Sequence, residues 1–193
     1  PSKNVIHPRF KILADSLLAA GYVVVAPDYE GLGTPGIHPY LNLSSAAKSA
    51  LSAVQAAKDH YGKQLNGAWM SVGQSQGGHA SLATAEYANT DATYKGAVAG
   101  APASSLGKII LEVAPAALSS IEAQEIHCDI PLAARTCVDC YATFLAYEAL
   151  TRVGIKAEEP RFSYQDIFQA RAKSLGEFAE GLTGVNGLCL DNE

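Results

Sequence analysis

The sequence predicts an α/β fold, in which a small parallel sheet is flanked by helices and followed by a helical region. Apolar runs at residues 21–27, 68–73 and 96–102 have the length of strands, and the first is an unbroken β-branched run without polar alternation. Such runs are typical of parallel strands buried on both faces. A helical pattern at residues 8–20 precedes the first run, and another at residues 45–61 lies between the first and the second. Because helix and strand alternate, we expect a right-handed α/β sheet covered by helices.

The two flanking helices carry their own start and stop signals. The first opens on Pro8, repeats apolar residues at helical spacing and stops at Gly21. The second is expected to be capped by Ser44 or Ser45 and to end at Gly62, with its alanine-rich face buried.

Length and composition favour one globular domain with a hydrophobic core. The chain has 193 residues, of which 48% are hydrophobic, and a formal net charge of −5. It has no cluster of Lys and Arg, which argues against nucleic acid as a partner. No apolar run approaches the roughly 20 residues needed to cross a bilayer, so no transmembrane segment is expected.

The most informative stretch is Gly73-Gln74-Ser75-Gln76-Gly77, which follows an apolar run and precedes a helical pattern reaching about Ala88. A G-x-S-x-G turn between strand and helix presents its serine in a strained conformation, and glycines two positions away give the backbone room. The N-terminus of the following helix favours developing negative charge. Ser75 is therefore predicted to be a nucleophile. The alternative is a glycine-rich turn without chemistry.

The loop at residues 28–40 follows the first expected strand and is dense in Gly, Pro and polar groups. Ligands bind at the carboxyl ends of parallel strands, so this loop is a candidate pocket wall. Ordinary turn chemistry, with Asp28 bonding nearby amides, is the alternative. For His38 a packing or hydrogen-bonding role is favoured over a catalytic one.

From Ser104 onward the strand-like runs end. Residues 109–113, 138–150 and 164–176 are expected to form separate helices joined by links that contain Pro and Gly. We therefore divide the chain into a partial core at residues 1–103 and a helical cap at residues 104–193. A stripe on the middle helix either lines an acyl-binding groove or belongs to the core: Tyr141, Phe144 and Leu145.

Four cysteines lie in the last third of the chain: Cys128, Cys137, Cys140 and Cys189. An even, clustered set is compatible with disulfides in an oxidising compartment. Free thiols are a second possibility. A zinc site is a third, because Cys137 and Cys140 have C-x-x-C spacing and His127 is near in sequence, but no second ligand pair completes it.

Four blocks of sequence in combination resemble the secretory lipase family of the α/β-hydrolase fold. They lie at residues 21–33, 38–40, 73–79 and 98–103, and the resemblance covers about residues 8–103. It implies a serine ester hydrolase of lipase or esterase type, secreted, without metal or organic cofactor, acting on a small-molecule ester or lipid. A cap that contacts the lipid interface is implied as well.

Carried over to this chain, the resemblance makes Ser75 the nucleophile and the backbone N–H of Gln76 one oxyanion donor, with Gly73 and Gly77 as the glycines of the turn. It also implies that the triad Asp and His come after the cap, and that a further strand precedes residue 8 and lies between the strands at residues 21–27 and 68–73. The chain is accordingly expected to be a central fragment, inactive or very weak alone. Its strands either close up against each other or leave hydrophobic sheet edges open.

Candidates for a base within the chain are weak. His79 lies on the same helix as the serine but points around it, and His127 with Asp129 is the least unfavourable pair, ahead of His38 with Asp28. A non-catalytic relative that binds an apolar ligand or a partner remains an alternative, as does a serine peptidase or aromatic-ester esterase. The resemblance also suggests that Cys189 pairs with a cysteine outside the chain.

Overall fold

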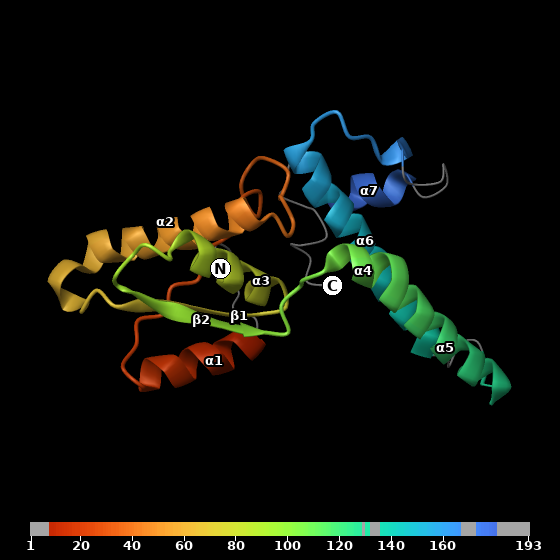
Figure 1. Cartoon of the computed structure of the whole chain (residues 1–193), viewed down its shortest axis with the longest axis horizontal. Helices are drawn as coiled ribbons and strands as arrows, with labels where there is room; N and C mark the ends of the chain where they lie inside the picture. The colour runs from red at the N-terminus through yellow and green to blue at the C-terminus, as the bar shows by residue number, and fades with distance from the viewer. Residues whose placement is uncertain (1–7, 129, 132–135, 167–172, 181–193) are drawn as a thin grey trace. The chain divides into compact units, whose positions relative to one another are not determined.

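The computed structural model describes residues 8–128, 130–131, 136–166 and 173–180 (Figure 1). The chain divides into two compact units. Unit 1 consists of Pro1–Gly36 and Leu41–Pro102, and unit 2 of Ile37–Tyr40 and Ala103–Glu193. Unit 1 is a mixed helix and strand layer, and unit 2 is helical.

The sheet of unit 1 has two parallel strands, β1 (Trp69–Gln74) and β2 (Tyr94–Gly100). Val72 pairs with Val98 and Gln74 with Gly100, after a register shift between Trp69 and Ser71. The predicted parallel α/β arrangement is confirmed for these two strands, although β2 begins and ends two residues earlier than expected.

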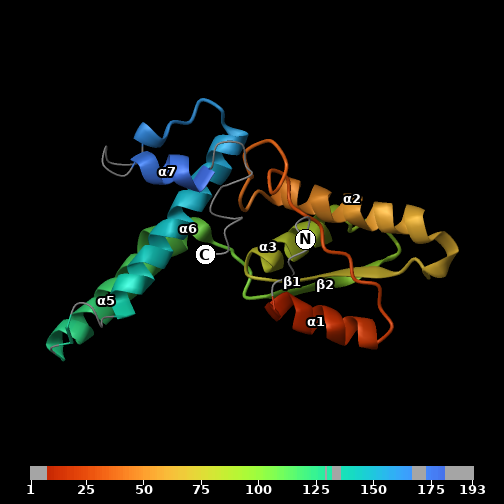
Figure 2. The same ribbon diagram turned by 180° about the vertical axis from the view of Figure 1, so that it is seen from behind.

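Helix α3 (Gln76–Tyr87) packs on one face of this sheet, and α2 (Leu43–Tyr61) packs against α3, so both helices lie on the same side of the strands (Figures 1 and 2). The contact is close because the buried residues of α3 are small: Ala80, Ala83 and Thr84. The Thr84 hydroxyl donates to the Ala80 carbonyl at 2.7 Å, which satisfies its polar group inside the core.

A cluster of three hydroxyl groups joins α3 to both strands. The Ser81 hydroxyl of α3 donates to the Ser71 Oγ at 3.0 Å, and the Ser71 hydroxyl lies 2.7 Å from the Tyr94 hydroxyl of β2. These bonds satisfy polar groups that the helix covers and fix its position along the strands.

The opposite face of the sheet is open, which corrects the expectation that helices cover it. Met70, Val72 and Val98 are 47%, 40% and 52% exposed. Helix α1 (Pro8–Ala19) lies on the other side of the strands from α2 in both views (Figures 1 and 2), yet its Ile12 is 70% exposed.

Residues 21–27 do not form the predicted strand. The segment leaves α1 through Gly21, at φ 86°, and carries no strand assignment, with Tyr22, Val23 and Val25 exposed. In the part of the chain that the structure describes, the sheet consists of β1 and β2. A β-branched run has strand propensity, but a strand requires a neighbour to accept its hydrogen bonds.

The N-cap of α2 lies two or three residues before the predicted position. Asn42, and not Ser44 or Ser45, is the N-cap, and its Oδ1 accepts the Ser45 backbone N–H at 2.7 Å. Asparagine is among the strongest N-cap residues. The helix ends at Gly62 as predicted, with φ 51°, and a short 3₁₀ turn, η1 (Gly62–Gln64), follows.

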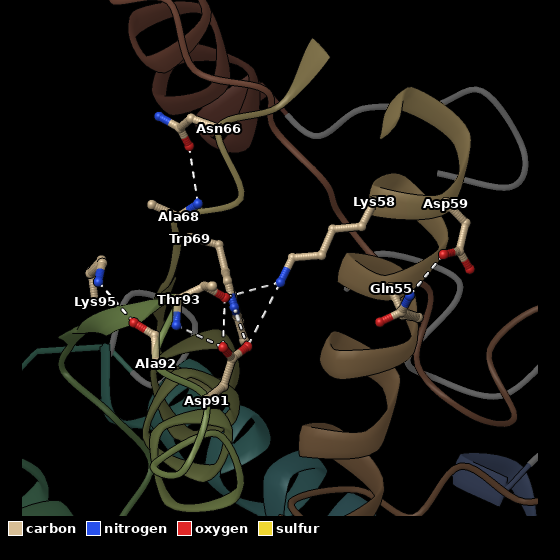
Figure 3. A network of polar contacts seen from close by, with 10 residues as sticks. All are labelled: Gln55, Lys58, Asp59, Asn66, Ala68, Trp69, Asp91, Ala92, Thr93 and Lys95. Atoms are coloured by element: carbon tan, nitrogen blue, oxygen red, sulfur yellow. Dashed lines mark hydrogen bonds and ion pairs between the residues drawn. The ribbon is translucent and has the colours of Figure 1, made fainter. Parts of the chain in front are cut away.

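A polar network centred on Asp91 ties α2 to the amino-terminal ends of both strands (Figure 3). One carboxylate oxygen accepts the Trp69 indole N–H at 2.9 Å, and the other accepts the Thr93 backbone N–H at 2.7 Å and its hydroxyl at 2.6 Å. Lys58 of α2 donates to the Thr93 hydroxyl at 3.1 Å and lies 3.7 Å from the carboxylate. This end of the sheet is opposite Ser75, which follows β1.

In unit 2, α4 (Leu106–Lys108), a π-helical turn η2 (Ile109–Val113) and α5 (Ala114–His127) follow one another without a break. The sequence predicts a helix only at residues 109–113 and a link after it, so α5 corrects the prediction. Pro115 is the second residue of α5, directly after the π-helical turn, and it has no N–H to donate to that turn.

Helix α6 (Thr136–Glu158) packs against α5 and α7 (Lys173–Glu180). It extends beyond the predicted 138–150 at both ends. The predicted helix at 164–176 appears as a short 3₁₀ turn, η4 (Tyr164–Asp166), and the start of α7, and residues 167–172 lie outside the described residues. On the stripe of α6, Tyr141 and Phe144 are half-buried and Leu145 is exposed. Among the described residues, each helix is too short or too polar to span a bilayer.

Candidate active site

Ser75 stands at the junction between β1 and α3, with one residue between the end of the strand at Gln74 and the first helical residue, Gln76. Its backbone has φ 54° and ψ −117°. A non-glycine residue in this region costs roughly 1–3 kcal/mol and persists only where the surroundings impose it. Here the Ser75 N–H donates to the Gly100 carbonyl at 2.9 Å, and its carbonyl accepts the His79 N–H at 3.0 Å. Both bonds hold the turn in place.

The glycine two residues before the serine is required by a close backbone approach. A Cβ atom on Gly73 would overlap the carbonyl group of Gly77. The chain therefore folds back on itself across Ser75 only because position 73 has no side chain, as the sequence motif predicts.

The role expected for Gly77 needs a correction. A Cβ atom on Gly77 would meet nothing within 4 Å, so the tight contact is made by its backbone and not by a missing side chain. The second glycine that the packing requires is Gly78. A Cβ there would lie 2.9 Å from the Gly100 carbonyl oxygen and 3.0 Å from the Pro102 Cα, so Gly78 brings α3 close to the end of β2.

The electrostatic setting of Ser75 suits a developing negative charge. The serine is the N-cap of α3, no side-chain bond caps that helix end, and the first turn of α3 contains no acidic residue. Backbone N–H groups of a first helical turn lack intrahelical acceptors, and the helix dipole adds partial positive charge there. Gln76 is the first residue of this turn, and Ser75 itself is exposed.

Of the described histidines, His79 is hydrogen-bonded to Ser75 through its own backbone N–H and the carbonyl of the serine. His38 is buried in unit 2, edge-on to Tyr40 with ring centroids 6.1 Å apart, and Asp28 belongs to unit 1. His127 is exposed at the end of α5, and its suggested partner Asp129 lies outside the described residues.

The loop at residues 28–36 contributes to a cavity of about 560 Å³ in unit 1. Asp28, Tyr29 and Glu30 line it together with Ser45 and Lys48 of α2, and the Ser45 hydroxyl donates to Glu30 at 2.7 Å. Burial raises the pKa of the Tyr29 phenol. Ser75 is not among the lining residues. The remainder of the predicted pocket wall, Ile37–Tyr40, belongs to unit 2.

The residues considered for a metal site or for disulfides are not joined in either way among the described residues. Among the described residues no group of three or more His, Cys, Asp or Glu side chains is arranged to hold a metal ion. Cys128, Cys137 and Cys140 are free thiols, and Cys189 lies outside the described residues.

The structure thus combines a parallel α/β layer with a serine held at positive φ between a strand and a helix, which is a strand–turn–helix arrangement. The chain belongs to the secretory lipase family, whose family model matches residues 10–128. That range contains the whole of β1, Ser75 and α3. Membership assigns the chain to lipase-like carboxylic ester hydrolases at the level of the family, and the family's name implies secretion. No curated protein matches the chain in a search, and neither does any solved structure.

Proposed function

We propose that this chain supplies the nucleophile of a serine carboxylic-ester hydrolase. The observation that carries the proposal is Ser75 at φ 54°, with Gly73 pressed against the Gly77 carbonyl. In the proposed reaction the Ser75 hydroxyl attacks the ester carbonyl, the alcohol leaves, and water hydrolyses the acyl-serine. The Gln76 N–H donates to the oxyanion of each tetrahedral intermediate.

We propose that the general base comes from outside residues 1–193. The bond between His79 and Ser75 joins backbone atoms, and a serine without a base at its hydroxyl is a weak nucleophile. Loss of the base in a serine hydrolase costs several orders of magnitude in rate. Residues 1–193 by themselves are therefore expected to hydrolyse esters very slowly.

We further propose that unit 1 is part of an α/β-hydrolase core and that unit 2 is its cap, the substrate being a lipid or another carboxylic ester. The family supports this substrate class, and apolar side chains exposed on the helices of unit 2, among them Leu111, Ile126 and Leu145, offer surface to a lipid interface. Hydrolysis of p-nitrophenyl esters of increasing acyl length by the full-length natural protein separates a lipase from an esterase limited to acetyl esters.

A fluorophosphonate probe followed by mass spectrometry tests the nucleophile. In the full-length natural protein, the phosphonyl group is expected on Ser75 and to be absent from Ser75→Ala. The exposed Ser104→Ala variant is the matched control and keeps the label. Label on a different serine would overturn the assignment of Ser75, and an unlabelled but folded full-length protein would favour the non-catalytic binding alternative.

The same probe on residues 1–193 tests the source of the base. We expect no label within the time that saturates the full-length protein. Rapid labelling of Ser75 there would show that one of this chain's own histidines activates the serine, which would refute the second part of the proposal and leave the first intact.

A further inference from the structure

Two cysteines lie in the first two turns of α6, three residues apart. Cys137 is the second residue of the helix and Cys140 the fifth. Side chains three apart share a helix face, with Cβ atoms about 5–6 Å apart, and a disulfide needs about 3.5–4.5 Å. A small adjustment of one helical turn therefore brings the two sulfur atoms within bonding distance.

The two thiols differ in exposure. Cys137 is only 3% exposed, whereas Cys140 is half-buried and accessible to a small reagent. In a dithiol of this kind the accessible sulfur meets an external disulfide first, and the buried sulfur completes the exchange.

A carboxylate from α5 stands at the buried sulfur. Glu125 is 8% exposed, and its Oε1 accepts the Thr136 N–H at 2.7 Å while its Oε2 accepts the Cys137 N–H at 3.1 Å. Interactions with the side chain of Cys137 and with the backbone N–H groups of Cys137 and Thr136 hold the pKa of Glu125 below its usual range. The residue that carries the buried sulfur is thus hydrogen-bonded, through its backbone, to an ionised carboxylate.

We propose that Cys137 and Cys140 form a redox-active dithiol that exchanges with low-molecular-weight disulfides such as oxidised glutathione, with Glu125 as the proton acceptor for Cys137. The site is independent of Ser75 and of the proposed ester hydrolysis. Unlike the zinc site considered from the sequence, this dithiol requires two sulfur atoms and no further ligand.

The exchange proceeds in two steps. The Cys140 thiolate attacks one sulfur of oxidised glutathione, the S–S bond breaks, and one glutathione leaves as thiolate. Cys137 then transfers its proton to Glu125 and attacks the Cys140 sulfur, which releases the second glutathione. Two protein thiols are oxidised to one disulfide, and one glutathione disulfide is reduced to two thiols.

Intact-mass spectrometry after exposure to oxidised glutathione tests the proposal, in a chain with Cys128→Ser and Cys189→Ser to remove the other thiols. We expect the loss of two hydrogen atoms, no retained glutathione, and a Cys137 to Cys140 bond on peptide mapping. Cys137→Ser is expected to keep one glutathione on Cys140. Cys140→Ser is expected to remain unmodified, because Cys137 is buried.

Glu125→Gln tests the carboxylate, with Glu122→Gln on the same helix as the matched control. Loss of a proton acceptor typically slows a step by roughly 10²-fold or more, so the glutathione adduct on Cys140 is expected to accumulate in Glu125→Gln only. Far-UV circular dichroism checks that α6 stays folded.

Two results would overturn the proposal. One is a Cys140 adduct in the parent chain that never closes to a disulfide. The other is a Cys128 bond to Cys137 or Cys140 as the main product when Cys128 is restored. Closure at the parent rate in folded Glu125→Gln would remove Glu125 from the mechanism. If that variant unfolds, the two single-cysteine variants still decide whether the dithiol exists and which sulfur reacts first.

Discussion

At the scale of single residues, the turn that holds Ser75 depends on the absence of one side chain. Replacing Gly73 with Ala places a methyl group against the Gly77 carbonyl, and a backbone atom cannot rotate away. Overpacking of this kind costs about 1–3 kcal/mol. Gly73→Ala is therefore expected to lower the unfolding free energy in urea by that amount, and to abolish probe labelling in the full-length protein.

Gly77→Ala is the matched control, because a Cβ there meets nothing within 4 Å and Gly77 is not one of the glycines with a positive φ. Its unfolding free energy is expected to stay close to that of the parent. Equal destabilisation by the two substitutions would mean that the backbone overlap at position 73 is not what holds the turn.

Asp91 makes stability depend on pH. The Thr93 hydroxyl, the Trp69 indole and the Thr93 backbone N–H all donate to its carboxylate, and these bonds hold its pKa well below the usual range. A carboxyl group whose pKa is lower in the folded than in the unfolded state contributes stability above the unfolded pKa of about 3.9, and loses it as the pH falls toward the folded value.

Asp91→Asn is thus expected to lower the free energy of unfolding at pH 7. It is also expected to reduce the fall in that free energy between about pH 5 and pH 3, a range around the unfolded pKa. Urea unfolding followed by the fluorescence of Trp69, the single tryptophan of the chain, measures both effects. Asp59→Asn is the control, since its carboxylate accepts one exposed bond from Gln55. A parallel pH dependence in Asp91→Asn and the parent would contradict the assignment.

At the scale of elements, α1 and α2 were predictable, whereas α5 and the absence of a strand at residues 21–27 were not. The patterns at 8–20 and 45–61 predicted α1 and α2 because a helix satisfies its backbone bonds within its own segment. Residues 21–27 have the same β-branched composition as a buried strand, but pairing depends on a neighbour far along the chain, which local sequence does not reveal. For the same reason Gly73 was predictable from the motif, whereas Gly78 was not, since its contact is with Gly100.

The start of α2 gives a prediction for one element. Asn42→Ala removes the acceptor for the Ser45 N–H and is expected to lower the unfolding free energy by about 1 kcal/mol. Asn42→Asp keeps an acceptor at the same place and is expected to retain most of the stability. If Asn42→Asp loses as much as Asn42→Ala, the side-chain cap is not the source of the effect. Urea unfolding of the three proteins side by side makes the comparison.

At the scale of the whole molecule, the sheet of unit 1 presents an apolar face and an unpaired strand edge. Met70, Val72 and Val98 are exposed on it, and among the described residues β1 has a partner strand only on the β2 side. An exposed apolar face next to an open edge is a site of self-association. Residues 1–193 are therefore expected to associate as their concentration rises.

Val98→Lys tests this expectation, because Val98 is more than half exposed and a charge there opposes strand and face association without opening a cavity. Light scattering against concentration is expected to show a smaller average mass for Val98→Lys than for the parent, at a similar unfolding free energy. Val153→Lys is the contrasting variant: Val153 is buried in α6, so its replacement is expected to destabilise the fold and to increase association. Equal association of the parent and Val98→Lys would place the contact elsewhere, and the exposed apolar residues of unit 2 would be the next surface to test.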